Sequence, residues 1–205
     1  MTKNTSPAPL DFPISRFANL RLIGLVILVV VALVLLLLAR GDTDANKIID
    51  LVSMFENGPA RKYPQAASGL AKIGKPAIPT ILELLEDGNI WAAMALQEMG
   101  SDAADTVPAL VQAVQEGEPS MRAFASNALG QIGVSSDEAL TVLIQTLEDE
   151  HWNARQLAAG ALGYLSGDDP RVKAALTKAL QDENEKVRWD AGRALDQIQK
   201  KTGGV

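Results

Sequence analysis

Two acid–arginine pairs and one histidine are the residues of this sequence whose types and spacing could do chemistry. Asp149 stands six residues before Arg155, and Asp182 stands six residues before Arg188. A carboxylate and a guanidinium at such a separation could act as an acid–base pair or hold an anion. His151 lies beside the first pair, and histidine is the side chain that titrates nearest to neutral pH. A general base is therefore one hypothesis for His151, and a solvated turn residue is the other.

The rest of the sequence does not complete a catalytic set. Catalysis needs an oriented partner and a nucleophile or substrate pocket, and the chain has no Gly-rich phosphate loop, no GxSxG and no HExxH. Cysteine is absent and His151 is the only histidine, so a multi-histidine metal site cannot form within one chain. We therefore interpret His151 as a turn residue, and we predict no catalytic residues, no cofactor, no metal and no enzymatic activity.

The elements that would position these residues recur along the chain with a fixed period. An Ala-Leu pair occurs every 33 residues, at Ala95/Leu96, Ala128/Leu129, Ala161/Leu162 and Ala194/Leu195. Leu70 stands in an earlier copy, and every copy has an alanine four residues before this anchor leucine. The second copy is four residues shorter, which removes about one helical turn. The pattern predicts five stacked helix–turn–helix repeats and an all-α fold.

These copies, for example VPALVQAVQEGEPSMRAFASNALGQIG, resemble HEAT repeats of the short bacterial type that also occurs in phycobilisome bilin lyases. The resemblance covers residues 46–199 and rests on an acidic residue after the first helix and a hydrophobic-Arg pair that opens the second. That pair occurs at Met121-Arg122, Ala154-Arg155 and Val187-Arg188. Repeats one and two depart from it, with Tyr63 and Asn89 at the arginine position.

The resemblance implies a right-handed α-solenoid whose second helices line a concave side and whose usual role is to bind other macromolecules. It also implies that the Asp and Arg residues tie one repeat to the next instead of doing chemistry. On the side of the second helices opposite the buried stripe, we expect a protein-binding concave face. Its predicted members are Ile90, Met94, Gln97, Asn127, Gln131, Gln156, Tyr164, Trp189 and Arg193. The alternatives are an ordinary exposed helix face and, for Trp189, a residue that covers the end of the solenoid.

An uncharged stretch precedes the repeats. Leu22 to Ala39 is eighteen residues long, roughly 27 Å as a helix, which matches the hydrocarbon thickness of a bilayer. A buried core helix and a cleaved signal peptide are the alternatives, and the poor cleavage site at Thr43-Asp44-Ala45 favours a retained anchor. Arg16 and Arg21 before the stretch favour a cytoplasmic N-terminus and an exported repeat domain. The predicted organisation is a flexible segment 1–21, a transmembrane helix 22–39, a linker 40–45, a HEAT-like repeat domain 46–200 and a tail 201–205.

The net charge of the chain bears on which binding partners are expected. The net charge is −6, and residues 1–40 contain four Lys/Arg and one acid, so the remainder has fifteen bases and twenty-four acids and a net charge of −9. Phosphate binding depends on clustered positive charge, so nucleic acid is not an expected partner.

The leading functional hypothesis is a single-pass membrane adaptor or scaffold that binds a protein partner, in particular a membrane protein or membrane-associated complex, through the solenoid. An accessory subunit of a membrane complex is a variant of this hypothesis. The alternative is a bilin lyase-like or chaperone-like protein that acts on a tetrapyrrole or its carrier protein. Capture of a peptide or lipid by the concave face is a third possibility.

Overall fold

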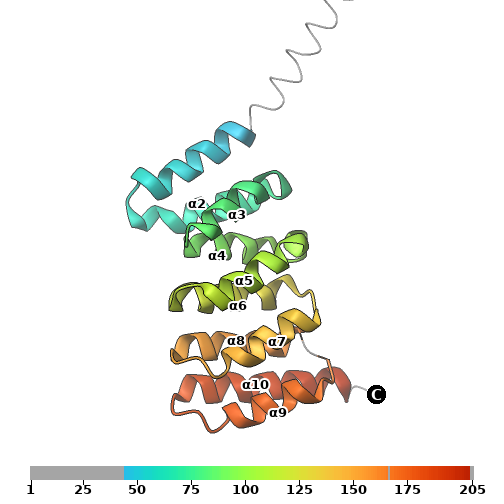
Figure 1. Cartoon of the computed structure of the whole chain (residues 1–205). Helices are drawn as coiled ribbons and strands as arrows, with labels where there is room; N and C mark the ends of the chain where they lie inside the picture. The colour runs from blue at the N-terminus through green and yellow to red at the C-terminus, as the bar shows by residue number, and fades with distance from the viewer. Residues whose placement is uncertain (1–43, 166, 204–205) are drawn as a thin grey trace, which may run out of the picture. The chain divides into compact units, whose positions relative to one another are not determined.

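The computed structural model describes residues 44–165 and 167–203, and all the regular elements in these ranges are helices. The chain divides into a unit of residues 1–45 and a compact unit of residues 46–205. The second unit is the repeat domain. Its helices follow one another in pairs and stack from the blue end to the red end of Figure 1.

Each pair has a first and a second helix, joined by a short turn. The first helices are 44–57, α3 (Ile78–Glu86), α5 (Val107–Glu116), α7 (Asp137–Thr146) and α9 (Pro170–Ala179). The second helices are α2 (Tyr63–Ile73), α4 (Ile90–Met99), α6 (Pro119–Ile132), α8 (Trp152–Leu165) and α10 (Glu185–Thr202). Short 3-10 segments lie at η1 (Ala60–Lys62), η2 (Lys75–Ala77) and η3 (Gly100–Thr106). The predicted all-α repeat solenoid is confirmed.

The anchor leucines form the centre of the core. Leu70, Leu96, Leu129 and Leu162 are fully buried, and each lies on a second helix that packs against the second helix of the next repeat. Leu195, the fifth, is only partly buried, because no further described repeat covers it. The periodic pattern thus identified the core correctly because each repeat buries its apolar face against its neighbour.

The second helices pack against one another far more extensively than the first helices do. Glycine makes the close approach possible: a Cβ on Gly130 would lie 2.7 Å from the Cα of Ala161, and a Cβ on Gly163 would lie 2.9 Å from the Cα of Ala194. A stack that is tighter along one layer curves toward that layer. The second helices therefore form the more closely packed layer, which is the layer that the family resemblance predicts for the concave side.

Local contacts close the helix ends. Gly133 ends α6 with φ 77° and ψ 8°, a left-handed conformation that glycine adopts without a side-chain penalty. Side-chain oxygens cap the N-termini of α7, α9 and α10. Ser136 accepts from the backbone N–H of Ala139, Asp169 from that of Arg171, and Asn184 from that of Lys186. These caps fix where the turns of repeats four and five lie.

The predicted location as a single-pass membrane protein, with a cytoplasmic N-terminus and an exported repeat domain, is contradicted. Within residues 44–165 and 167–203, no helix is long and apolar enough to cross a membrane. The longest, α10, has 18 residues, but its sequence EKVRWDAGRALDQIQKKT carries charges along its whole length. The stretch 22–39, the predicted flexible segment 1–21 and residues 40–43 of the predicted linker lie outside the described residues.

The last helix extends to Thr202, two residues beyond the predicted end of the repeat domain. Lys201 explains this extension, because its Nζ donates to the carbonyl oxygens of Gly163 at 3.1 Å and Tyr164 at 2.7 Å. The final turn of α10 is thereby fastened to the end of α8.

Candidate protein-interaction surface

The arginines that open the second helices form a ladder between repeats. Arg122 donates from Nε and Nη2 to the two carboxylate oxygens of Asp149, at 2.6 and 2.8 Å. Arg155 makes the same two bonds to Asp182, at 2.7 and 3.0 Å. Each arginine therefore reaches an aspartate 27 residues further along, in the next repeat, and the bidentate geometry fixes both groups.

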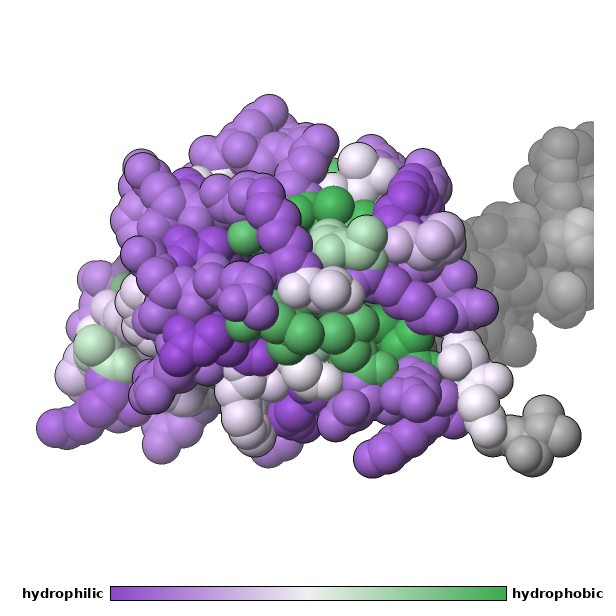
Figure 2. All heavy atoms as spheres, turned by 90° about the horizontal axis from the view of Figure 1, so that it is seen from below, coloured by the Kyte–Doolittle hydropathy of each residue, from purple (hydrophilic) through white to green (hydrophobic). Residues whose placement is uncertain are grey.

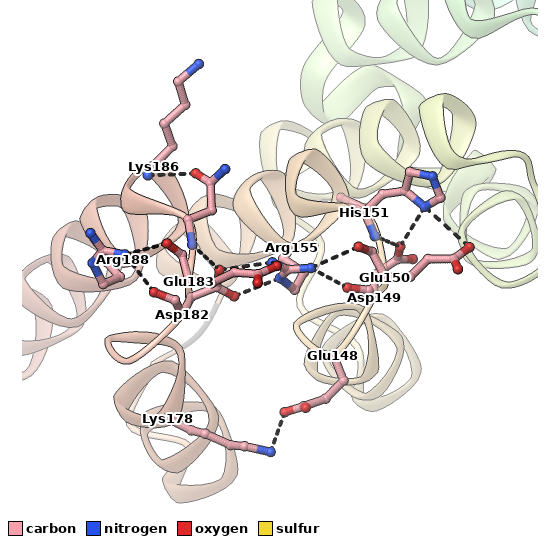
Figure 3. Close-up of polar contacts among 12 residues, drawn as sticks. Glu148, Asp149, Glu150, His151, Arg155, Lys178, Asp182, Glu183, Lys186 and Arg188 are labelled. Carbon is pink, nitrogen blue, oxygen red and sulfur yellow. Dashed lines mark hydrogen bonds and ion pairs between the residues drawn. The ribbon is translucent and has the colours of Figure 1, made fainter.

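The arginine also binds the turn of its own repeat. Nη1 of Arg155 donates to the carbonyl oxygens of Asp149 at 2.7 Å and Glu150 at 3.2 Å, as Figure 3 shows. The two acid–arginine pairs predicted within single repeats are thus contacts to main-chain oxygens. The carboxylates themselves pair across the boundary between repeats, which agrees with the role that the family resemblance implied.

Arg188 is the third arginine of the series, and it lacks the carboxylate. Its Nη1 donates to the carbonyl oxygens of Asp182 at 2.7 Å and Glu183 at 2.9 Å, so it adopts the pose of Arg155 (Figure 3). Its side chain is exposed; its charge helps to lower the pKa of Asp182, but no acidic side chain among the described residues forms a close ion pair with it. The ladder therefore ends on an unpaired guanidinium edge.

The electrostatics of the ladder favour fully charged groups. The Arg155 hydrogen bonds hold the pKa of Asp182 below its ordinary value, against the opposing effect of burial. For Asp149, burial opposes ionisation most strongly, but the hydrogen bonds from Arg122 and from the His151 amide still lower its pKa. Carboxylates held ionised by a bidentate arginine have no free proton to exchange near neutral pH. The ladder is suited to joining repeats.

Acid should weaken the repeat domain through these two carboxylates. Their pKa values are lower in the folded chain than in the unfolded chain, so the stability they contribute is present above about pH 4 and is lost as the pH falls through the folded values. We expect the urea midpoint, followed by circular dichroism, to fall between about pH 5 and pH 2. Asp182→Asn should make the urea midpoint depend less on pH. If the variant kept the pH profile of the wild type, the acid sensitivity could not be attributed to the Asp182 carboxylate.

His151 remains a surface residue of the turn before α8. Its side chain is 46% exposed, its Nδ1 lies 3.4 Å from Nη2 of Arg122, and its backbone N–H donates to Asp149 at 2.8 Å. No group of three metal-ligating side chains gathers here or elsewhere in residues 44–165 and 167–203. The neighbours of His151 are the ladder groups, and the structure places no nucleophile beside it.

Repeat two lacks the ladder arginine for a structural reason. Its second helix, α4, has 10 residues, whereas α6 and α8 have 14 each. α4 therefore begins one residue after the arginine position, and Asn89, which occupies that position, caps the helix by accepting from the N–H of Trp91. A hollow of about 600 Å³ remains between repeats two and three, with Leu85, Ile90 and Met121 among its lining residues.

The predicted concave-face residues all lie on second helices, and they differ in exposure. Gln131, Tyr164, Trp189 and Arg193 are exposed, while Met94, Gln97, Asn127 and Gln156 are half-buried. Ile90 is the member that packs partly against the core and lines the hollow. The exposed part of the concave face therefore lies mainly on repeats three to five.

Polar contacts connect this face from repeat to repeat. Nδ2 of Asn127 donates to Oε1 of Gln97 at 2.7 Å, and Nε2 of Gln156 donates to Oδ2 of Asp190 at 2.8 Å. Arg193 stacks over the Trp189 ring at 4.6 Å and lies 3.5 Å from Asp190. Because neighbours hold these side chains, a partner meets a surface with little rotamer freedom left to lose.

Sequence reasoning missed Trp152 as a member of this surface. Trp152 is the first residue of α8, is 41% exposed, and has Nζ of Lys186 at 4.8 Å from its ring centroid. It stands four residues before Gln156, so the helical spacing could have found it.

The comparisons with known proteins agree with this architecture. The model for HEAT repeats matches residues 89–149 and 140–203, and the model for the PBS lyase HEAT-like repeat matches residues 65–87. A search of curated proteins gives no match.

Three of the solved structures that resemble the chain illustrate the shared fold. One is from the complex of CpcE and CpcF of phycocyanin lyase from Nostoc sp. PCC7120, at 22% identity and a TM-score of 0.61, covering 74% of this chain and 99% of that chain. An engineered protein has 23% identity and a TM-score of 0.53, covering 80% and 83%. A designed armadillo repeat protein in complex with the peptide (KR)4 has 18% identity and a TM-score of 0.51, covering 72% and 80%.

At these identities the three structures show a shared fold. The family is shown by the repeat model, which covers more than half of the sequence and includes both rungs of the arginine–aspartate ladder. The chain belongs to the HEAT-repeat family.

Proposed function

We propose that this chain is a binding protein that holds a partner protein against the concave face of repeats three to five, without catalysing a reaction itself. The observation that carries the proposal is the placement of large exposed side chains. Trp152, Tyr164 and Trp189 are 41%, 47% and 63% exposed and all lie on the second helices α8 and α10. Such aromatic side chains supply much of the energy of protein interfaces.

The rigidity of the face supports the same function. HEAT repeats present an extended surface whose shape is set by stacking, and the amide and ion contacts between neighbouring second helices hold its side chains in place. Binding to such a surface loses little conformational entropy on the side of the repeat protein. The face also mixes Arg193 and Lys186 with Asp190, so a partner segment with both apolar and charged side chains fits it best.

A second candidate function, which the comparisons favour, is a lyase-like or chaperone-like role on the same face. The PBS lyase HEAT-like repeat in residues 65–87 and the fold shared with a phycocyanin lyase chain support it. Two flat aromatic rings, each with a cation within 5 Å, could also hold a planar acidic ligand such as an open-chain tetrapyrrole. On this hypothesis the partner is a pigment-carrier protein or the pigment itself.

A titration distinguishes the pigment from the carrier protein as the partner. The purified full chain is mixed with biliverdin, an open-chain tetrapyrrole, and the visible absorbance is followed for the wild type and for Trp189→Ala. A saturable spectral change that Trp189→Ala weakens supports pigment binding. An unchanged spectrum removes the pigment and leaves the carrier protein or another protein as the partner.

Site-specific photo-cross-linking identifies a protein partner. A photo-reactive amino acid replaces Tyr164 on the concave face or Ile49, which is 64% exposed on the first-helix layer. We expect one defined adduct from position 164 in cells of the source organism, and none from position 49. Adducts from position 49 alone would place the partner on the opposite layer and contradict the proposal.

A further inference from the structure

The end of the repeat domain beyond α9 and α10 exposes an apolar surface. Figure 2 shows this end with hydrophobic atoms along its middle and hydrophilic side chains around them. Ala175, Leu180 and Leu195 are only partly buried here, whereas the anchor leucines of the other repeats are completely covered. We call this surface the C-terminal end face.

Unpaired charges flank the apolar part of the face. Arg188, Gly192 and Asp196 are spaced four residues apart, so they lie on one side of α10. Arg188 points an unpaired guanidinium edge outward, as described above, and exposed Asp196 has no ion-pair partner among the described residues. Along this side of α10 the face therefore presents a cation and an anion at equal distances on either side of Gly192.

The position after the anchor leucine decides how closely a following helix can approach. In repeats three and four this position is Gly130 or Gly163, and a Cβ there would lie 2.7 or 2.9 Å from a Cα of the next helix. In repeat two it is Gln97, whose side chain is accommodated because it accepts a hydrogen bond from Asn127 of the next helix. The same position in α10 is Asp196, so a helix that packs on this face must offer Asp196 a polar or charged partner.

We propose that the C-terminal end face binds a second copy of this chain, with the two α10 helices antiparallel and crossing at Gly192. A two-fold axis through this crossing places Arg188 of each copy against Asp196 of the other, because the two positions are symmetric about residue 192. The axis also lays α9 over α9, so both apolar parts are covered together. Gly192 has no side chain to separate the helices at the crossing.

The size of the face sets the strength of this contact. An 18-residue helix is about 27 Å long, and two packed helices present a face on the order of 500 Å². Two copies would bury about 1,000 Å² together, which is at the lower end for specific interfaces. The contact is therefore small enough for a reversible dimer.

Cysteine cross-linking tests the geometry directly, because the chain contains no cysteine. Gly192→Cys adds a thiol on the proposed axis at a position where a Cβ meets only Leu180, at 3.7 Å. Gly160→Cys is the matched control, on a helix with open space around its Cβ. We expect the full-length Gly192→Cys chain to form a disulfide dimer on mild oxidation and Gly160→Cys to stay monomeric. Equal cross-linking of both variants, or of neither, would overturn the proposal.

Charge reversal tests the pairing in the same Gly192→Cys background. Arg188→Glu and Asp196→Arg should each lower the dimer yield by about tenfold, since like charges then face each other. The combined Arg188→Glu/Asp196→Arg chain should regain most of the yield, which a merely misfolded end could not do. Circular dichroism melting of each variant confirms that the helices are intact. If the combined variant is folded but its dimer yield stays low, the antiparallel pairing of Arg188 with Asp196 is contradicted.

Discussion

Arg155→Ala is expected to lower the free energy of unfolding by about 3 kcal/mol, which is typical of removing one partner from a buried ion pair. The side chains of Arg155 and Asp182 are only 9% and 10% exposed, so the carboxylate left behind would be poorly hydrated. Two main-chain carbonyl oxygens in the preceding turn would lose their donor as well. For a domain of this size the melting temperature should fall by roughly 10 °C.

Arg188→Ala is the matched control for this prediction. Arg188 makes the same two carbonyl contacts as Arg155, but it is exposed and has no carboxylate partner. Its removal should therefore cost about 1 kcal/mol or less. Urea unfolding of both variants, followed by circular dichroism, gives the comparison. Equal losses would show that the carboxylate pair is not the source of the stability.

Gly130→Ala is expected to destabilise the chain by about 1 to 3 kcal/mol through overpacking. The new methyl group would lie 2.7 Å from the Cα and 2.8 Å from the Cβ of Ala161, and neither atom belongs to a flexible side chain that could turn away. The two helices would have to separate, which would also loosen the contact between repeats three and four.

Gly160→Ala should have the opposite sign. Gly160 lies in the middle of α8 with nothing within 4 Å of its Cβ position. Alanine is preferred over glycine in a helix by about 1 kcal/mol, so this variant should be slightly more stable than the wild type. Destabilisation by both substitutions would mean that helix propensity and packing do not account for the tight second-helix layer.

The sequence predicted the stack well because its signals are local and periodic. Leu96, Leu129 and Leu162 recur at 33 residues, and each repeat buries the same face, so the core could be assigned from spacing alone. The shortened second repeat also kept its face, as the loss of one helical turn requires.

Other features depend on how neighbouring repeats meet, which spacing within one repeat does not reveal. Arg155 was paired in sequence with Asp149, yet its guanidinium crosses to Asp182, 27 residues further on. Lys201 fastens the last helical turn to the carbonyl oxygens of Gly163 and Tyr164, a contact with no local sequence signal. The membrane prediction rested on residues outside the described helices, and no described helix is long and apolar enough to support it.

The concave face could be outlined from the family geometry, but its organisation could not. The helical wheel placed Tyr164 and Trp189 on it, and both are exposed. The hydrogen bond from Asn127 to Gln97 depends on helix-to-helix distances that only the three-dimensional stack provides. Whether this face binds a partner remains a proposal that binding measurements must test.

The most direct measurement is the calorimetric affinity of the cross-linked partner, once purified, for three forms of the full chain. Trp189→Ala should weaken binding by at least tenfold relative to the wild type, because truncating an aromatic residue at the centre of an interface commonly costs about 2 kcal/mol. Ile49→Ala, which removes a similarly exposed side chain from the first-helix layer, should leave the affinity unchanged. Unchanged affinity in Trp189→Ala together with loss in Ile49→Ala would contradict binding on the concave face.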